Sequence, residues 1–128
     1  MDEAIVYVDH SEIRPGGVDE VRKRVTELVE FIRAHEPRLS CYGYFIDDRG
    51  SSMTVVAVHP DSASLEFHMR VGAPEFRKLA DLIDLRSIEI YGTPSETVLG
   101  QLDEKARTLG SNGRVVVHQP TAGFARPT

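Results

Sequence analysis

Segments with a strand-like run of hydrophobic residues alternate along the chain with segments in which hydrophobic residues recur at helical spacing. This pattern predicts alternating strands and helices. Residues 4–9, AIVYVD, are mostly β-branched or aromatic and predict a first strand. From Val18 to Ile32, apolar side chains return every three or four positions, which is the spacing of one helix face. We expect this helix to end near His35, because Pro37 cannot continue it.

The middle of the chain predicts a hairpin and then a helix. The runs 39–47 (LSCYGYFID) and 53–59 (MTVVAVH) are strand-like, and the short link between them contains a glycine. Such a link is typical of an antiparallel β-hairpin. The next stretch, 63–72 (ASLEFHMRVG), is helical in pattern, with Asp61 or Ser62 as its N-cap.

Helical spacing continues beyond this stretch and then gives way to a fourth strand. Gly72 and Pro74 are expected either to divide the helix into two pieces or to bend it. Apolar residues from Phe76 to Ile83 again repeat at helical spacing. The run 86–92, RSIEIYG, predicts the fourth strand.

The order strand, helix, strand, strand, helix, strand is that of the ferredoxin-like βαββαβ fold. In this α+β class, an antiparallel sheet carries both helices on one face. A chain of 128 residues fits one domain. We therefore expect a single domain over residues 1–128, with a core at 4–92 and a C-terminal extension at 93–128.

The extension is expected to contain a third helix and a fifth strand. In TPSE, Thr93 is expected as the N-cap and Pro94 as the first helical residue, with Glu96 completing a capping box. Gly110 is expected to end this helix, and RVVVH at 114–118 predicts the strand. These elements either cover the open face of their own sheet or reach across to embrace a partner.

A sheet with helices on one side only leaves its other face bare, and here both faces are apolar. Tyr42, Tyr44 and Ile46 point one way, while Cys41 and Phe45 point the other. Each large apolar side chain left in water forgoes roughly 1.5 to 3 kcal/mol, so several of them outweigh the entropy cost of pairing two chains. We therefore expect a homodimer that packs sheet against sheet.

Charge and composition exclude several classes of protein. The formal net charge is −5 and the chain has no long run of lysine or arginine, so we expect no nucleic-acid partner. No apolar run reaches the length that spans a bilayer, so we expect no membrane partner. The first residues, MDEAIVYVD, lack the pattern of a secretory signal. The cytoplasm is therefore the expected compartment.

Cys41 is the only cysteine in the chain. A single cysteine excludes an intrachain disulfide and a metal cluster held by several thiolates. Because Cys41 lies within a strand pattern, we expect its side chain to be a small buried hydrophobe rather than a nucleophile.

The stretch 59–79, HPDSASLEFHMRVGAPEFRKL, follows a strand with an acidic turn, a short helix that carries a histidine, a small-residue break and an aromatic-containing helix. Together with the order of elements over residues 4–92, this motif resembles the antibiotic biosynthesis monooxygenase-like family of dimeric α+β barrels. The resemblance implies a pocket in each subunit between sheet and helices. In the enzymes of that family it implies oxygenation of phenols or quinols without a cofactor.

Carried onto this chain, the resemblance makes His68 the helix histidine and a candidate catalytic base for a phenolic proton. The ordinary pKa of imidazole, about 6.5, suits that task. In the alternative interpretation, His68 is a neutral core residue whose ring nitrogens are satisfied by backbone or by a carboxylate. Tyr42, Tyr44 and Tyr91, together with Tyr7, are strand aromatics that could line the pocket and hold a small aromatic or quinone-like ligand.

No cofactor is expected. The chain has no tryptophan and its single asparagine, Asn112, lies in a predicted turn, so the asparagine, tryptophan and histidine set of haem-degrading relatives is absent. His59 ends a strand before Pro60 and is expected to be structural or to contact a ligand. A metal site formed with His68 and Asp61 is the weaker alternative, because no HxH or HExxH spacing supports it, and we expect no metal.

Glu89 lies between two isoleucines on the predicted fourth strand and is a further candidate for ligand binding. If it is buried, this carboxylate needs a partner such as Arg86, His68 or Tyr91. The tail at 122–126, AGFAR, is either a latch over the pocket or the dimer seam, or else disordered.

The leading interpretation is a homodimeric, monooxygenase-like protein that binds a small molecule. Oxygenation of a phenol or quinol is its candidate reaction. The alternative is a non-catalytic dimeric binding or interaction protein.

Overall fold

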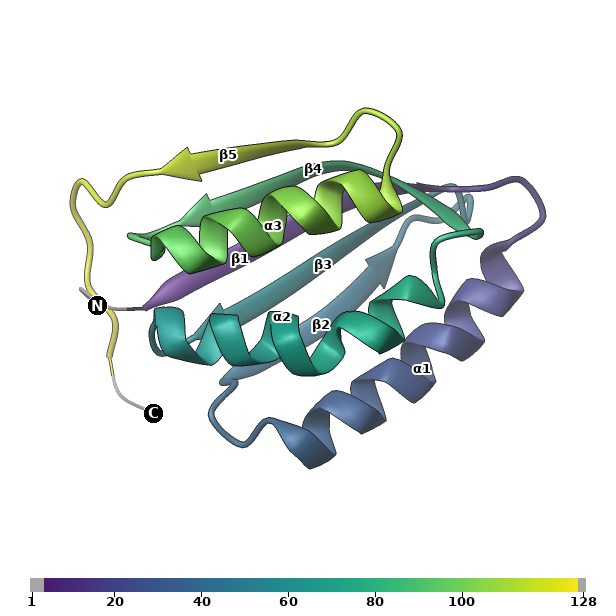
Figure 1. Ribbon diagram of the computed structural model, residues 1–128. Coiled ribbons are helices and arrows are strands. Elements are labelled where there is room, and N and C mark those ends of the chain that lie inside the picture. Colours follow the sequence, from purple (N-terminus) through teal and green to yellow (C-terminus); the bar gives the residue numbers. More distant parts are fainter. Residues whose placement is uncertain (1–3, 127–128) are drawn as a thin grey trace.

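Strands and helices alternate along the computed structural model, which describes residues 4–126 (Figure 1). The first six elements follow the order βαββαβ, so the predicted α+β, ferredoxin-like arrangement is confirmed. The elements are β1 (Ile5–Ile13), α1 (Val18–His35), β2 (Cys41–Ile46), β3 (Ser52–His59), α2 (Ser62–Arg77), β4 (Ile83–Tyr91), α3 (Glu96–Leu109) and β5 (Arg114–His118).

The strands form one five-stranded sheet in the order β2-β3-β1-β4-β5. The first four strands pair antiparallel, and β5 adds to the edge parallel to β4. On the covered face, the register places small or medium side chains of β3 between polar side chains of β1 and β2. Tyr7 of β1 pairs with Ala57 of β3, which in turn pairs with Tyr42 of β2. The two tyrosines therefore lie in one row across the sheet, on the same face.

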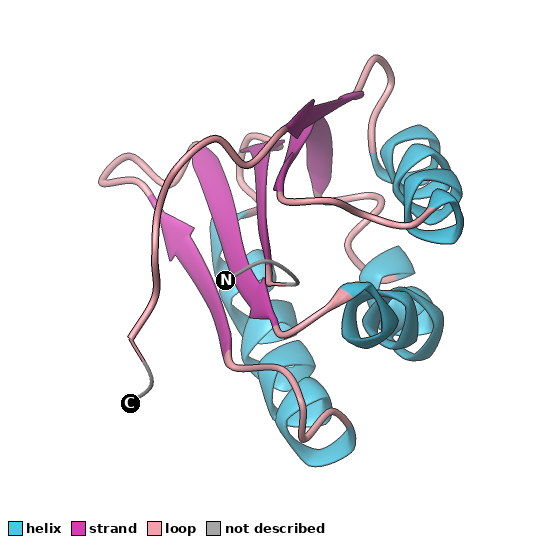
Figure 2. Ribbon diagram, turned by 90° about the vertical axis from the view of Figure 1, so that its left-hand side faces the viewer, coloured by secondary structure: helices cyan, strands magenta, loops and turns pink. Residues whose placement is uncertain are grey.

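All three helices lie on one side of the sheet, and Figure 2 shows the other side uncovered. α3 packs next to α2 and against β4, so the extension does not cover the open face of its own sheet. Residues 119–126 are exposed and lead away from the helices, on the side of the uncovered face (Figure 2). Every helix within residues 4–126 is too short or too polar to pass through a bilayer.

The core lies between the sheet and this helix layer. Alternate residues of β1 and β3 face the helices, and burying each large apolar one stabilises the fold by roughly 1.5 to 3 kcal/mol. On α1, the buried residues are Val21, Val25, Leu28 and Ile32, as the helical spacing predicts. The helix bounds expected from sequence, Val18 to His35, are confirmed.

Two element boundaries differ from the sequence prediction. β1 continues past residue 9 to Ile13, because alternate residues stay buried although Ser11 is polar. α2 is a single helix with Pro74 inside it, and it ends at Arg77 rather than continuing toward Ile83. Ile83 instead opens β4, where buried and less buried positions alternate.

The helix caps confirm one prediction and correct another. Asp61 caps α2, and its Oδ1 accepts the backbone N–H of Ser64 at 2.9 Å. The predicted N-cap of α3, Thr93, is wrong, because Ser95 fills that position and its Oγ accepts the N–H of Val98 at 3.2 Å. Gly110 ends α3 as predicted.

Cys41 is exposed, which corrects the expectation of a buried thiol. It begins β2, the edge strand, and its side chain shares the uncovered face with Phe45, which is 61% exposed. The strand pattern placed both residues on one face correctly, but in the single chain no second layer of protein covers that face.

Candidate functional site

Polar side chains gather on the covered face of the sheet, where a core is ordinarily apolar. β1 turns Tyr7 and Asp9 toward the helices, β2 turns Tyr42 and Tyr44 the same way, and β3 ends there with His59. The helix layer and its connections add further groups. We call this set the buried polar array; it comprises Tyr7, Asp9, Glu36, Tyr42, Tyr44, His59, His68 and Lys105.

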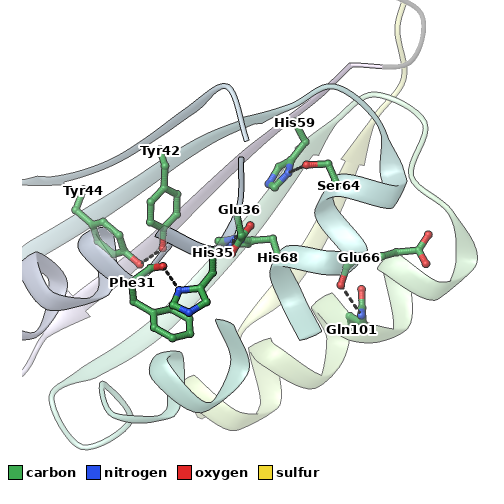
Figure 3. A network of polar contacts seen from close by, with 10 residues as sticks. All are labelled: Phe31, His35, Glu36, Tyr42, Tyr44, His59, Ser64, Glu66, His68 and Gln101. Carbon is green, nitrogen blue, oxygen red and sulfur yellow. Dashed lines mark hydrogen bonds and ion pairs between the residues drawn. The ribbon is translucent and has the colours of Figure 1, made fainter. Parts of the chain in front are cut away.

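His68 and Glu36 form the central pair of this array (Figure 3). The Nδ1 atom of His68 lies 2.8 Å from Oε1 and 2.9 Å from Oε2 of Glu36. His68 projects from α2, and Glu36 is the C-cap residue of α1. The carboxylate thus fixes the orientation of the ring and leaves Nε2, which makes no hydrogen bond within residues 4–126, as the atom that can take a proton.

Burial sets the protonation of this pair. Burial, and then the nearby charge of Lys105, lowers the pKa of His68 to about 3. Burial raises the pKa of Glu36 to about 7. At neutral pH the imidazole is therefore uncharged and able to accept a proton, but its lowered pKa makes it a weaker base than the ordinary value of about 6.5 expected from the sequence.

Aromatic rings hold His68 from several sides. Its ring centroid lies 5.2 Å from that of Tyr42 and 5.2 Å from that of Phe76. The ring of His59 lies 5.3 Å away. These contacts leave the imidazole little freedom, so its position is set before any ligand arrives.

His59 is fully buried and belongs to the same cluster. Its Nδ1 lies 2.8 Å from Oγ of Ser64, while its Nε2 has no partner among the described residues. Burial lowers the pKa of this ring to about 3. Asp61 caps α2 and pairs with Arg38 instead of completing a metal site. Over the described part of the chain, no group of three or more His, Cys, Asp or Glu residues is placed to hold a metal ion.

Tyr42 and Tyr44 bring two phenol groups together. Their hydroxyl oxygens lie 2.5 Å apart, and their rings meet edge to face (Figure 3). Burial raises the pKa of both, so both are neutral phenols at physiological pH. The pair can therefore donate one hydrogen bond and still accept others.

Lys105 brings a buried positive charge from α3 into the array. Its Nζ donates to the Tyr7 hydroxyl at 2.8 Å and lies 3.5 Å from Oδ2 of Asp9. The Tyr7 hydroxyl in turn donates to Asp9. The ring centroid of Phe76 lies 4.2 Å from Nζ. Burial lowers the pKa of Lys105 and raises that of Tyr7, and the neighbouring carboxylate opposes the loss of the lysine charge.

The position of Lys105 in the sequence predicts that it is buried, although it is not one of the apolar residues of α3. Lys105 falls three residues after Leu102 and four before Leu109, on the buried stripe of α3. A lysine at such a position is unusual unless it is paired. Asp9 continues the inward alternation of β1 in the same way. Glu36 is the C-cap residue of α1, so it lies after the helix and the helical period does not predict its burial.

Cavities near the array are of two kinds. A small cavity of about 10 Å³ touches Asp9, Ser11 and Tyr44, and the Ser11 hydroxyl has no partner among the described residues. That space suits about one water molecule. Two larger clefts, of about 360 and 290 Å³, flank the segment 36–39 and both include Glu36 in their walls. His68 lies in the wall of neither cleft, whereas Tyr42 lines the larger one.

Tyr91 and Glu89 lie on the uncovered face, and the structure does not bring them together with His68. Glu89 accepts from Nε2 of His118 at 2.9 Å and lies 3.8 Å from Nε2 of His10. The partners named for a buried Glu89 are therefore not required, because this carboxylate is only half-buried; Arg86 pairs with Glu12 and Tyr91 stacks on His118. The cause is the register of β4, which turns Glu89 away from the helices.

Comparison with known proteins gives a likeness of fold. No family model and no curated protein sequence matches this chain. MupZ from Pseudomonas fluorescens superposes with a TM-score of 0.75 at 17% identity, over 98% of this chain and 96% of that one. SnoaB of Streptomyces nogalater, a cofactor-independent oxygenase studied as its N63A mutant, gives 0.61 at 14% identity, over 73% and 95%. A protein described as an antibiotic biosynthesis monooxygenase gives 0.61 at 21% identity, over 71% and 99%.

These neighbours confirm, at the level of fold, the resemblance to the monooxygenase-like group that the sequence indicated. The neighbours differ in how much of this chain their structural match covers. SnoaB and the antibiotic biosynthesis monooxygenase match less than three quarters of it, whereas the match to MupZ is long enough to include the α3–β5 extension. The extension is thus part of a larger fold that MupZ shares.

Proposed function

We propose that this chain is a homodimeric protein of the monooxygenase-like group that binds a small phenol or quinol and oxygenates it without a cofactor. The observation that carries the proposal is the buried pair of His68 and Glu36 beside the two phenol groups of Tyr42 and Tyr44. The fold shared with a cofactor-independent oxygenase supports the same reaction class.

In this reaction, Nε2 of His68 accepts the phenolic proton of the substrate. Glu36 holds Nδ1 and stabilises the imidazolium ion that forms, as an acidic partner does in other imidazole bases. The resulting phenolate is electron-rich and reacts with dioxygen directly. One oxygen atom enters the substrate, and the other leaves as water with two hydrogens taken from the same substrate.

The larger cleft beside residues 36–39 gives the substrate its route to this pair. Its volume of about 360 Å³ lies within the range of small-molecule sites, and Glu36 and Tyr42 stand in its wall. Tyr42 meets His68 edge to face, so a ring that displaces the Tyr42 side chain comes directly against the imidazole. Once Tyr42 is displaced, the hydroxyl of Tyr44 has lost its partner and supplies a hydrogen bond to an oxygen of the bound ring.

The uncovered face of the sheet is the surface through which we propose that two chains pair. Val6, Val8, Val56 and Val58 place a patch of valines on that face beside the exposed Phe45. Pairing two such faces removes this apolar surface from water and builds the α+β barrel. The free thiol of Cys41 fits the reducing cytoplasm, which is the compartment we propose.

A non-catalytic binding protein is the second candidate, and one observation favours it. The cavity beside Asp9 and Tyr44 has only about 10 Å³, and His68 borders neither of the larger clefts. A binding protein whose polar array is purely structural would have this geometry.

Incubation with a panel of quinols and polyphenols under ¹⁸O₂ distinguishes the two candidates. For the oxygenase we expect oxygen uptake and ¹⁸O in a product, with kcat lowered at least a hundredfold in His68→Gln and about tenfold in Glu36→Gln. Glu30→Gln, at an exposed position on α1 outside the clefts, is the control matched to Glu36→Gln and retains full activity. Equal product from the wild type and His68→Gln removes the proposed base. Ligand binding without oxygen uptake assigns the second candidate.

A further inference from the structure

A separate cleft opens between α2 and α3, in the helix layer rather than beside residues 36–39. Its volume is about 210 Å³. Arg70 and Arg77 of α2 and Lys105 of α3 stand in its wall, with Glu104 as the single carboxylate. The cleft is therefore locally positive on a chain whose net charge is −5.

The two arginines of the cleft are available to bind an anion. Neither Arg70 nor Arg77 forms an ion pair in the part of the chain that the structure describes, and the described contact of Arg70 is with the ring of Phe67, 5.5 Å from its Cζ atom. Lys105, in contrast, is already paired with Asp9 at the base of the cleft. An anion at the cleft would find its partners in the arginines, whose planar guanidinium groups match a carboxylate.

The rest of the wall is suited to a ring. Ala73, Phe76 and Leu109 give the cleft an apolar side, and Phe76 and Leu109 are almost fully buried. A protein cavity of about 150 Å³ holds benzene. A space of about 210 Å³ therefore has room for one aromatic ring and a small substituent.

We propose that this cleft binds a small aromatic monocarboxylate, with its ring against Phe76 and Ala73 and its carboxylate held by Arg70 and Arg77. The cleft is separate from the one beside residues 36–39, although Phe76 and Lys105 in its wall also adjoin His68, and occupying it requires no turnover. Binding measured here therefore stands or falls independently of the reaction assigned to His68.

Benzoate and benzamide form a matched pair of probes, because they have nearly the same shape and differ in charge. The full chain, labelled with ¹⁵N, is titrated with each and followed by NMR. We expect benzoate to bind at least five times more tightly than benzamide, with the largest shifts at residues of α2 and α3 that line the cleft. We also expect 0.5 M NaCl to remove most of this preference, because the arginines are exposed to solvent.

Variants assign the two parts of the site. The double substitution Arg70→Gln and Arg77→Gln is expected to lower benzoate affinity at least fivefold and to leave benzamide affinity unchanged. Arg107→Gln, an exposed arginine of α3 outside the cleft, is the control and keeps wild-type affinity. Ala73→Phe fills the cleft and is expected to abolish binding of both probes. The three arginines are exposed and Ala73 is half-buried, so we expect each variant to fold, and its amide spectrum checks this.

The proposal is overturned if the two probes bind equally, if Arg107→Gln loses as much affinity as the double variant, or if the shifts fall outside the cleft. Absence of any saturable shift with benzoate in the folded wild type also overturns it.

Discussion

The imidazole of His68 and the carboxylate of Glu36 meet inside the fold, with Nδ1 2.8 Å from Oε1 and with only 3% and 2% of the two side chains exposed. The residues are 32 positions apart and are held by two different helices. A titratable pair at such depth ties the stability of the protein to pH.

Glu36→Gln tests this link. Burial raises the pKa of Glu36 from its ordinary 4.5 to about 7, so the folded chain binds this proton more tightly than the unfolded chain does. The stability that the protonated carboxyl provides is complete below pH 4.5 and is lost as the pH rises toward 7. Because the glutamine side chain does not titrate, we expect the variant to gain roughly 1 to 2 kcal/mol relative to the wild type over this range, after allowance for solvent near the pair.

Urea denaturation at several pH values between 4 and 8 measures this difference. Glu30→Gln, on the exposed side of α1, is the control and is expected to follow the wild type. A constant difference between Glu36→Gln and the wild type across the range contradicts the assignment. His59 bonds to Ser64 and not to Glu36, so its contribution cancels in the comparison.

Asp9 and Lys105 are expected to behave as one unit. Lys105→Met leaves the Asp9 carboxylate buried without a counter-charge, and breaking such a pair costs about 3 to 5 kcal/mol. Asp9→Asn strands the lysine in the same way. The double variant removes both charges, so we expect it to recover most of the loss. Chemical denaturation of the four proteins gives the coupling, and additive single losses would show that the two groups do not interact.

Phe45 is expected to control self-association. It lies on the uncovered face and is 61% exposed, so Phe45→Glu places a charge where the proposed dimer needs an apolar surface. Phe67, 38% exposed on α2, lies in the helix layer, and Phe67→Glu is the matched control. In sedimentation equilibrium at micromolar concentration we expect dimers for the wild type and Phe67→Glu, and monomers for Phe45→Glu. A monomeric wild type removes the dimer from the proposed function.

Two glycines at and within α3 are expected to respond oppositely to alanine. A Cβ at Gly110 would overlap the carbonyl oxygen of Leu85, because the end of the helix lies against β4. We expect Gly110→Ala to destabilise the fold by about 1 to 3 kcal/mol. A Cβ added at Gly100 would meet no atom within 4 Å, so Gly100→Ala is expected to stabilise the helix by about 1 kcal/mol. Thermal unfolding compares the two, and a loss in both variants would contradict this packing.

Much of the fold follows from the period of its apolar residues, and the differences have a common cause. The first strand was expected to stop at residue 9 because Ser11 breaks the apolar alternation, although the backbone continues to Ile13. Apolar residues up to Ile83 fit helical spacing, yet the chain turns after Arg77 and Ile83 enters the sheet. In each case the pairing of distant segments, rather than local period, decides where the element ends.

The candidate site was only partly predictable for the same reason. His68 stood out because it shares the apolar face of its helix with Leu65. Glu36 gave no such signal, since its burial depends on a contact with a residue 32 positions away. Tyr42 and Tyr91 look equivalent as strand tyrosines, but the register of the sheet sends them to opposite faces.

The central place of β1 also governs how the chain is assembled during synthesis. Its residues pair with partners as late as His59 on one side and Tyr91 on the other. The hairpin of β2 and β3 joins neighbours in sequence and can form early, and β1 can pair with β3 once His59 has been made, whereas the pairing of β1 with β4 must wait until Tyr91 has left the ribosome. Until then the edge of β1 that pairs with β4 stays open, and shielding of this edge by a chaperone would matter most in that interval.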